Sequence, residues 1–461
     1  MTVARELAKR IVGTRYEELT PGALRYARIG LLDTLGVGIA GSREDAAIIA
    51  RKIAGRTAGA ALVWGTTRRA EPLEAAFLNG IAANVLDFDD CTDNLGGHPS
   101  APILPALLAL AEERSASGRD VLTAYVAGFE TETQLGRGVN FHHYEKGWHP
   151  TATLGIFGAG AAAAKLLRLD DQRTAHTLAL CASMAAGLKS NLGSMGKPLH
   201  IGHCSRSGLL AALLAAEGFT GNDDALEHPQ GFLEVFNGPG TYSIERILEK
   251  WGTPWEIEIP GIAIKQYPCC LSMQAPVDLI LRLVCEHDVR PDRVERVLAR
   301  ISQRRLAHTN RPDPRSALDA KLSMQYVLAR ALTERCVTLE HFEGDAFKDP
   351  ATRQAMKLID AAAFGDDSVH AEMGAAITIV LKDGSRVGGT IDHAVGHGAG
   401  QPLPQKLLEA KFTACSKGNL TPQRSEKIAG AIADFEALPD LRAFMRLLEP
   451  ARKSARVAAA Q

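Results

Sequence analysis

The densest group of titratable side chains in the sequence is Asp87-Phe88-Asp89-Asp90-Cys91, which Gly96-Gly97-His98-Pro99-Ser100 follows closely. Carboxylates and an imidazole on one loop between two helices can form a general acid/base group or part of a metal site. The same residues also suit helix capping, because the aspartates can end one helix and Pro99-Ser100 can begin the next. Loops on a rigid scaffold often carry functional residues, so both interpretations stay open.

Two further loops carry basic side chains beside glycines. Gly147-Trp148-His149-Pro150-Thr151 leads into a helix, where His149 is either a carboxylate-binding group or a turn residue without a ligand. The predicted loop Gly193-Ser194-Met195-Gly196-Lys197 continues to His203 and Cys204, and Lys197 needs an anionic partner if it is buried. No second ligand pair at zinc-site spacing accompanies this loop, so we expect no metal.

The remaining candidates lie in the second half of the chain. Lys265 follows an apolar run and is either a cation that closes on a substrate or a solvated surface lysine. The adjacent thiols Cys269 and Cys270 indicate redox or metal chemistry only weakly, since structural thiols are more common. Tyr326 lies in a predicted helix, where a tyrosine is usually a core residue but its hydroxyl can also act as an acid. The assembled set suits binding of a di- or tricarboxylate and proton transfer beside its carboxylates, with no cofactor.

The elements that must hold these residues are mainly helical. Apolar residues recur with the 3.6-residue period over most of the first 260 residues, and Ala and Gly at many of these positions indicate close helix packing. Helices are expected over residues 21–40, 73–86, 101–115, 121–135, 153–167, 173–188 and 205–217. Gly158-Ala159-Gly160-Ala161-Ala162-Ala163 has the spacing of a dinucleotide-binding motif, but no strand precedes it, so it is interpreted as helix packing.

The pattern changes near residues 259–261. Helices are expected over 276–287 and 316–332, a strand over Val294–Ile301, and a hairpin whose strands Ala375–Leu381 and Arg386–Ile391 flank an Asp-Gly turn. The expected fold is therefore mainly α, with a large all-helical domain and a smaller α+β lid domain. The boundaries are 1–261 for the helical domain and 262–395 for the lid, with helices in 396–461 returning to the helical domain.

Length and composition limit the classes of protein. The 461 residues exceed what one hydrophobic core usually organises, and 46% apolar with 23% charged residues is ordinary globular composition. A net charge of −1 excludes a global field that attracts nucleic acid or an anionic membrane, and no apolar run is long enough to span a bilayer. The eight cysteines without regular spacing and the amphipathic N-terminus predict a cytoplasmic protein.

The sequence motifs resemble those of the MmgE/PrpD family, in the same order and over nearly the whole chain. They lie around Asp87, His98, His149, Lys197, Lys265 and Tyr326. This family includes 2-methylcitrate dehydratase, cis-aconitate decarboxylase and iminodisuccinate epimerase. The resemblance implies a helical main domain, a smaller lid domain, a homodimer, and an active site for a small polycarboxylate between the domains.

The resemblance also implies roles for individual residues. Asp87, His98, His149 and Tyr326 are the expected catalytic residues, with Asp87 orienting His98 and Tyr326 supplying the opposing proton. The expected substrate-binding residues are Cys91, Lys197, Lys265 and Cys270. Cys91 and Cys270 stand where the decarboxylase carries Thr and His. The eleven-residue step from Asp87 to His98 is similar to the epimerase, whereas Tyr326 is similar to the decarboxylase. We expect a lyase, with an epimerase that uses the same pocket as the alternative.

Overall fold

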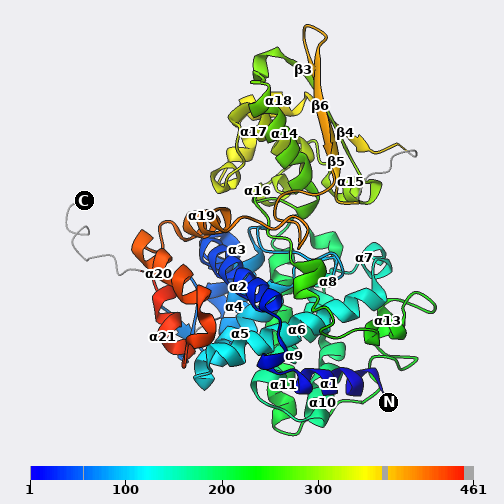
Figure 1. The fold of residues 1–461 in the computed structure, drawn as a ribbon, viewed down its shortest axis with the longest axis vertical. Helices are drawn as coiled ribbons and strands as arrows, with labels where there is room; N and C mark the ends of the chain where they lie inside the picture. The colour runs from blue at the N-terminus through cyan, green and yellow to red at the C-terminus, as the bar shows by residue number, and fades with distance from the viewer. Residues whose placement is uncertain (1, 55–56, 366–371, 451–461) are drawn as a thin grey trace, which may run out of the picture.

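The computed structural model describes residues 2–54, 57–365 and 372–450, and contains two large hydrophobic cores stacked along its long axis (Figure 1). The first core draws on residues from Val3 to Ile264 and again from Leu403 to Leu448. The second core draws only on residues from Tyr267 to Ala394. We call the two parts the helical body (residues 2–264 and 403–448) and the mixed body (residues 267–394).

Long helices pack side by side in the helical body. They are α1 (Val3–Gly13), α2 (Pro21–Gly41), α4 (Pro72–Asn84), α5 (Ser100–Arg114), α6 (Gly118–Val139), α9 (Gly155–Leu166), α10 (Asp171–Met184) and α11 (Gly196–Ala216). Shorter elements connect them: α3 (Asp45–Ile53), β1 (Ala61–Leu62), β2 (Arg69–Ala70), α7 (His142–Lys146), α8 (Pro150–Thr153), α12 (Phe232–Phe236) and α13 (Ile244–Leu248).

Small residues allow these helices to approach closely. A Cβ atom on Gly128 of α6 would lie 2.5 Å from the backbone oxygen of Gly158 in α9, so neither helix could stay in place with a larger residue there. The Gly158-to-Ala163 segment is therefore a packing surface inside α9, as the sequence predicts. The N-terminus of α2 is also built as expected, because the Thr20 side chain accepts a hydrogen bond from the Ala23 amide and Pro21 occupies the first turn.

The mixed body combines a four-stranded sheet with helices. Its elements are α14 (Gln274–Glu286), β3 (Val294–Ile301), α15 (Gln303–Thr309), α16 (Ala317–Ala320), α17 (Met324–Glu334), α18 (Pro350–Met356), β4 (Ile359–Ala363), β5 (Ala375–Leu381) and β6 (Arg386–Ile391). The strand order is β4-β3-β5-β6, with β3 and β4 parallel and the other pairs antiparallel. Helices α14 and α17 bury their apolar faces with β3 and β5 in the second core.

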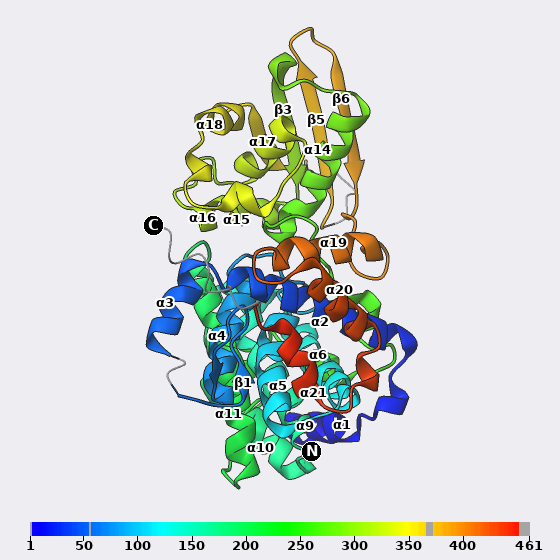
Figure 2. The same cartoon turned by 90° about the vertical axis from the view of Figure 1, so that its left-hand side faces the viewer.

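Three helices after the mixed body return to the first core, beside the N-terminal helices (Figure 2). They are α19 (Gln405–Ser416), α20 (Pro422–Ala433) and α21 (Leu441–Met445), and α19 packs against α2. None of the helices in the described part of the chain is long and apolar enough to cross a membrane.

The structure confirms the mainly α fold with a small mixed sheet, and it confirms strand Val294–Ile301 and the hairpin of β5 and β6. Two predictions are wrong. The helix expected over 316–332 is interrupted after α16, where Ser323 caps the start of α17 by accepting from the Tyr326 amide. Helix α11 starts at Gly196, so Lys197 and His200 lie on a helix instead of a loop. Pro198 is tolerated in the first turn of this helix because first-turn amides need no intrahelical partner.

Candidate active site

A small cavity of about 80 Å³ lies where the two bodies meet. The helical body contributes the titratable side chains Asp87, Cys91, Asp93, His98, Tyr144, His149 and Lys197 to its wall. The mixed body contributes the polar side chains Cys270, Ser272, Arg305 and His308. The cavity is small and is walled by polar and ionisable groups of both bodies, which suits a small charged ligand.

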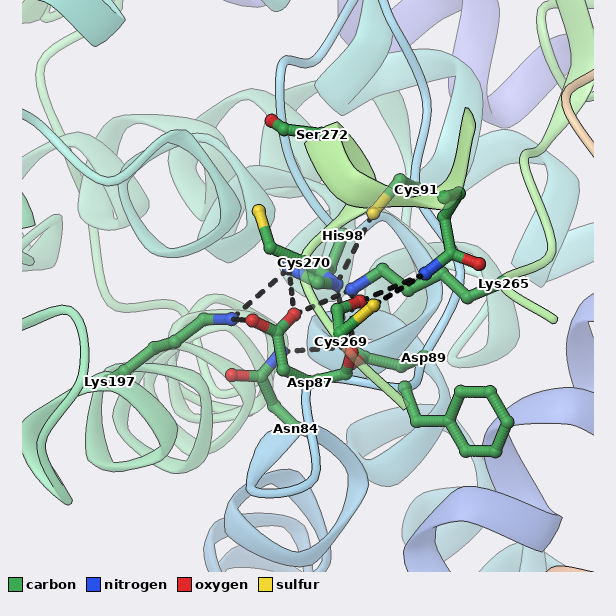
Figure 3. Close-up of polar contacts among 12 residues, drawn as sticks. Asn84, Asp87, Asp89, Cys91, His98, Lys197, Lys265, Cys269, Cys270 and Ser272 are labelled. Carbon is green, nitrogen blue, oxygen red and sulfur yellow. Dashed lines mark hydrogen bonds and ion pairs between the residues drawn. The ribbon is translucent and has the colours of Figure 1, made fainter. Parts of the chain in front are cut away.

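The Asp87 carboxylate is held between two ammonium groups (Figure 3). The Lys265 ammonium donates to Oδ1 at 2.6 Å and to the Asp87 backbone oxygen at 2.8 Å, while the Lys197 ammonium lies 2.9 Å from Oδ2. Burial raises the pKa of Asp87, but the charges of Lys197 and Lys265 outweigh it and hold the pKa well below its usual range. Asp87 has a positive φ of 52°, and the Lys265 contacts on both its backbone and its carboxylate stabilise that conformation.

His98 is oriented by Asp89. Its Nδ1 lies 3.1 Å from Oδ2 of Asp89, whereas its Nε2 lies 3.5 Å from both Oδ1 of Asp87 and the Lys197 ammonium. Asn84 donates to the same Asp89 oxygen at 2.8 Å and fixes that carboxylate. A carboxylate can only accept, and the shorter contact is at Nδ1, so the ring proton belongs on Nδ1 and Nε2 is an acceptor that faces the Lys197 ammonium.

Burial makes His98 a neutral base. Burial lowers the pKa of His98, Asp89 opposes that effect, and the charges of Lys265 and Lys197 lower the pKa further. The result is an imidazole that stays unprotonated at neutral pH and has its acceptor nitrogen beside the cavity. This is the state that a general base requires.

His149 is the N-cap residue of the short helix α8 and is buried. Its Nδ1 lies 3.2 Å from Nδ1 of His200 on α11, so one of the two rings donates to the other. Burial lowers the pKa of His149 well below its usual value, and the nearby Lys197 and His200 lower it further. His149 is therefore a neutral hydrogen-bonding group in the wall rather than a cation.

The two cysteines predicted to contact substrate both line the cavity. Cys91 Sγ lies 3.6 Å from Nδ1 of His98, and burial raises the pKa of its thiol, so it remains protonated. Cys270 Sγ lies 3.7 Å from Nε2 of His308.

Two of the predicted site residues do not line the cavity. The Lys265 side chain has no exposed area and lies behind Asp87. Tyr326 is fully buried in the second core, where its hydroxyl donates to the backbone oxygen of His341 and accepts from Nε of Arg330 at 3.1 Å. Lys265 thus positions Asp87 instead of facing a ligand, and Tyr326 has the contacts of a core residue.

Sequence reasoning missed Arg305 and His308, which lie on α15 directly after strand β3. It also assigned the orienting role to Asp87, whereas the carboxylate at Nδ1 of His98 is Asp89. The only sequence signal for the α15 residues is the basic run from Gln303 to His308, which also suits a solvated helix. Their place in the cavity depends on how the mixed body packs against the helical body.

Asp87, Asp89 and His98 are close enough together to be considered as metal ligands. However, both oxygens of Asp87 already face ammonium groups, and Nδ1 of His98 faces Asp89. A divalent cation would have to displace those partners and would meet two lysine charges within the same buried cluster. The donor set therefore fits acid/base chemistry better than metal binding.

The chain is similar in sequence to several characterised proteins. It matches the MmgE/PrpD N-terminal domain over residues 5–245 and the MmgE/PrpD C-terminal domain over residues 267–437. It is 30% identical to cis-aconitate decarboxylase of Mus musculus over 97% of this chain and 93% of that protein, and 30% identical to the Homo sapiens enzyme over 97% and 95%. It is 24% identical to 2-methylcitrate dehydratase of Cupriavidus necator over 92% and 93%. The chain therefore belongs to the MmgE/PrpD family.

Proposed function

We propose that this protein is a cofactor-independent lyase that acts on a small di- or tricarboxylate, with decarboxylation of an unsaturated tricarboxylate as the first choice and dehydration as the second. The observation that carries the proposal is the neutral His98, whose unprotonated Nε2 lies beside the Lys197 ammonium at the cavity. One group can remove or deliver a proton while the other holds a carboxylate. The relatives with 30% identity are both named cis-aconitate decarboxylase, which supports the order of preference.

In this proposal the Lys197 ammonium binds a substrate carboxylate, and the Arg305 guanidinium, which lines the cavity from the mixed body, is a second cation. These cations also stabilise the negative charge that develops beside the carboxylate when a proton or CO₂ leaves. Asp89 keeps the Nδ1 proton of His98 in place, so that Nε2 exchanges the proton with the substrate. Lys265 acts indirectly, because it fixes Asp87 and leaves the cavity side of that carboxylate to Lys197.

An epimerase is the second candidate, and one observation favours it. Titratable side chains line the cavity from both bodies, with His98 on one and His308 on the other. A proton could leave one face of a carbon and return on the other. We also propose a homodimer, as the family resemblance implies, and a solution mass of a single chain would contradict it.

A panel of citrate-, aconitate- and iminodisuccinate-type acids, incubated in D₂O and followed by NMR, tests these functions. We expect loss of CO₂ from an aconitate-type acid, or loss of water from a citrate-type acid, with a new or relocated C=C bond. Deuterium at a carbon of a recovered isomer with an unchanged skeleton, and no unsaturated or shortened product, would replace the lyase with the epimerase. No reaction with any of the acids would contradict both.

A further inference from the structure

Cys270 and His308 meet at the cavity although they come from different elements of the mixed body. Cys270 precedes a short helical turn and its amide donates to the backbone oxygen of Lys321 at 3.0 Å, while His308 lies on α15. The Cys270 sulfur lies 3.7 Å from Nε2 of His308, and the Ser272 hydroxyl lies 3.0 Å from the same nitrogen. All three side chains line the cavity that also contains His98 and Lys197.

The neighbouring Cys269 provides a contrast within the same chain segment. Its sulfur is fully buried, accepts a hydrogen bond from Nε2 of Gln274 at 3.4 Å, and does not line the cavity. Figure 3 shows the two sulfur atoms pointing in different directions. Two adjacent thiols are therefore placed in different environments, one in the core and one facing the site.

The charges around Cys270 favour its thiolate. Burial raises the pKa of this thiol, but the hydrogen bond and charge of His308 lower it more, to about 7. Lys265 also lowers the pKa and Asp87 opposes it, while Tyr144 and Arg305 line the same cavity. For Cys269, in contrast, burial dominates and raises the pKa.

We propose that Cys270 and His308 share a proton and form a second proton-transfer group, which faces the substrate from the mixed body while His98 faces it from the helical body. The role in turnover rests on the function proposed above, whereas the shared proton does not. The pair would take the role of opposing acid that the sequence analysis expected of Tyr326.

The step balances without a further reagent. When CO₂ leaves, the C–C electron pair stays on the substrate, and the carbon takes the proton held between Sγ and Nε2, so that a C–H bond forms. The pair then carries one negative charge, on the sulfur, beside a neutral imidazole. A proton from water restores it before the next turnover. In a dehydration the same proton goes to the leaving hydroxide, while His98 holds the proton taken from carbon.

The shared proton is tested without any substrate. The rate of alkylation by iodoacetamide is measured against pH in the full-length Cys269→Ser protein, with peptide mapping to separate Cys270 from the exposed Cys285. We expect Cys270 to react with a midpoint near pH 7, and the added change His308→Asn to slow its reaction at pH 6.5 on the order of tenfold, because only the thiolate reacts. Cys285 should be unaffected by that change. A Cys270 midpoint that is the same with and without His308 overturns the pair.

The role in turnover is tested with whichever acid the protein converts. Cys270→Ser and His308→Asn should each lower kcat about 10²-fold or more, and the double variant should be no worse than either single one, because the two residues act as a unit. Cys269→Ser should keep the wild-type kcat. Cys270→His places a titrating group on the same wall, so it should recover activity that no longer depends on His308.

If Cys270→Ser and His308→Asn both keep kcat within about threefold of wild type, a proton-transfer role is excluded. If alkylation shows the shared proton but no acid in the panel reacts, the proposed function fails while the pair itself stands. The two failures are therefore distinguishable.

Discussion

The Lys265 ammonium lies 2.6 Å from Oδ1 of Asp87 in a position with no exposed side-chain area, whereas Lys197 approaches Oδ2 at 2.9 Å from the cavity wall. The two lysines therefore have different roles. Lys265 neutralises and positions a buried carboxylate, and Lys197 is the ammonium that a ligand can reach.

Lys265→Met and Lys197→Met should separate these roles. Lys265→Met should lower the free energy of unfolding by about 3–5 kcal/mol, because removing one member of a buried ion pair leaves the other poorly compensated. Lys197→Met should keep more of the stability, since Lys265 still faces Asp87, and should mainly lower kcat/KM. Urea unfolding and steady-state kinetics measure both effects. Equal stability of the two variants would contradict the assignment.

Asp89→Asn should lower kcat about 10²-fold or more with little change in KM, because an amide does not hold the Nδ1 proton of His98 as a carboxylate does. Asp90→Asn is the matched control on the same loop. Burial and the charge of Asp33 raise the pKa of Asp90 to about 8, so its carboxyl is mostly neutral at pH 7 and an amide resembles it. Comparable loss of kcat in both variants would show that the loop, and not the Asp89 charge, is responsible.

The raised pKa of Asp90 predicts how the stability of the folded protein changes with pH. Its pKa is raised from about 3.8 to about 8, so the folded state keeps a proton that the unfolded state has lost. The contribution of Asp90 to stability is present below pH 4 and declines by at most about 1.4 kcal/mol per pH unit as the pH rises towards 8. Asp90→Asn should therefore become more stable relative to wild type between pH 4 and pH 8. A difference in Tm that is constant over this range would contradict the raised pKa.

Tyr326→Phe should keep kcat/KM close to wild type and lose about 1–3 kcal/mol of stability, because the missing hydroxyl leaves the His341 backbone oxygen and Arg330 without that buried partner. Thermal unfolding and kinetics on the same preparation check this. A large loss of kcat with unchanged Tm would restore Tyr326 to the catalytic group that the family resemblance implies.

Treatment with EDTA should leave activity unchanged, because lysine ammonium groups already occupy both oxygens of Asp87. Metal analysis of the purified protein, before and after chelation, is the measurement. One tightly bound ion per chain that is lost together with activity would show that Asp87, Asp89 and His98 are ligands after all.

Local sequence determined much of this protein. The strand Val294–Ile301 and the β5–β6 hairpin follow from β-rich apolar runs and an Asp-Gly turn, both of which act over a few residues. The clustering of Asp87, Asp89 and His98 could also be predicted from the sequence, because these residues are close in the chain and one loop can bring them together. Chain-wide motif order was sufficient to indicate the family.

Only the tertiary structure decided which of the candidate side chains line the cavity. Lys265 and Asp87 are 178 residues apart, and only the tertiary fold placed that lysine behind the carboxylate instead of in front of it. Packing within the mixed body buried Tyr326 in the second core and brought His308 to Cys270. Side-chain direction across such distances depends on the relative placement of whole helices and sheets. Residue type and spacing along the sequence do not determine that placement.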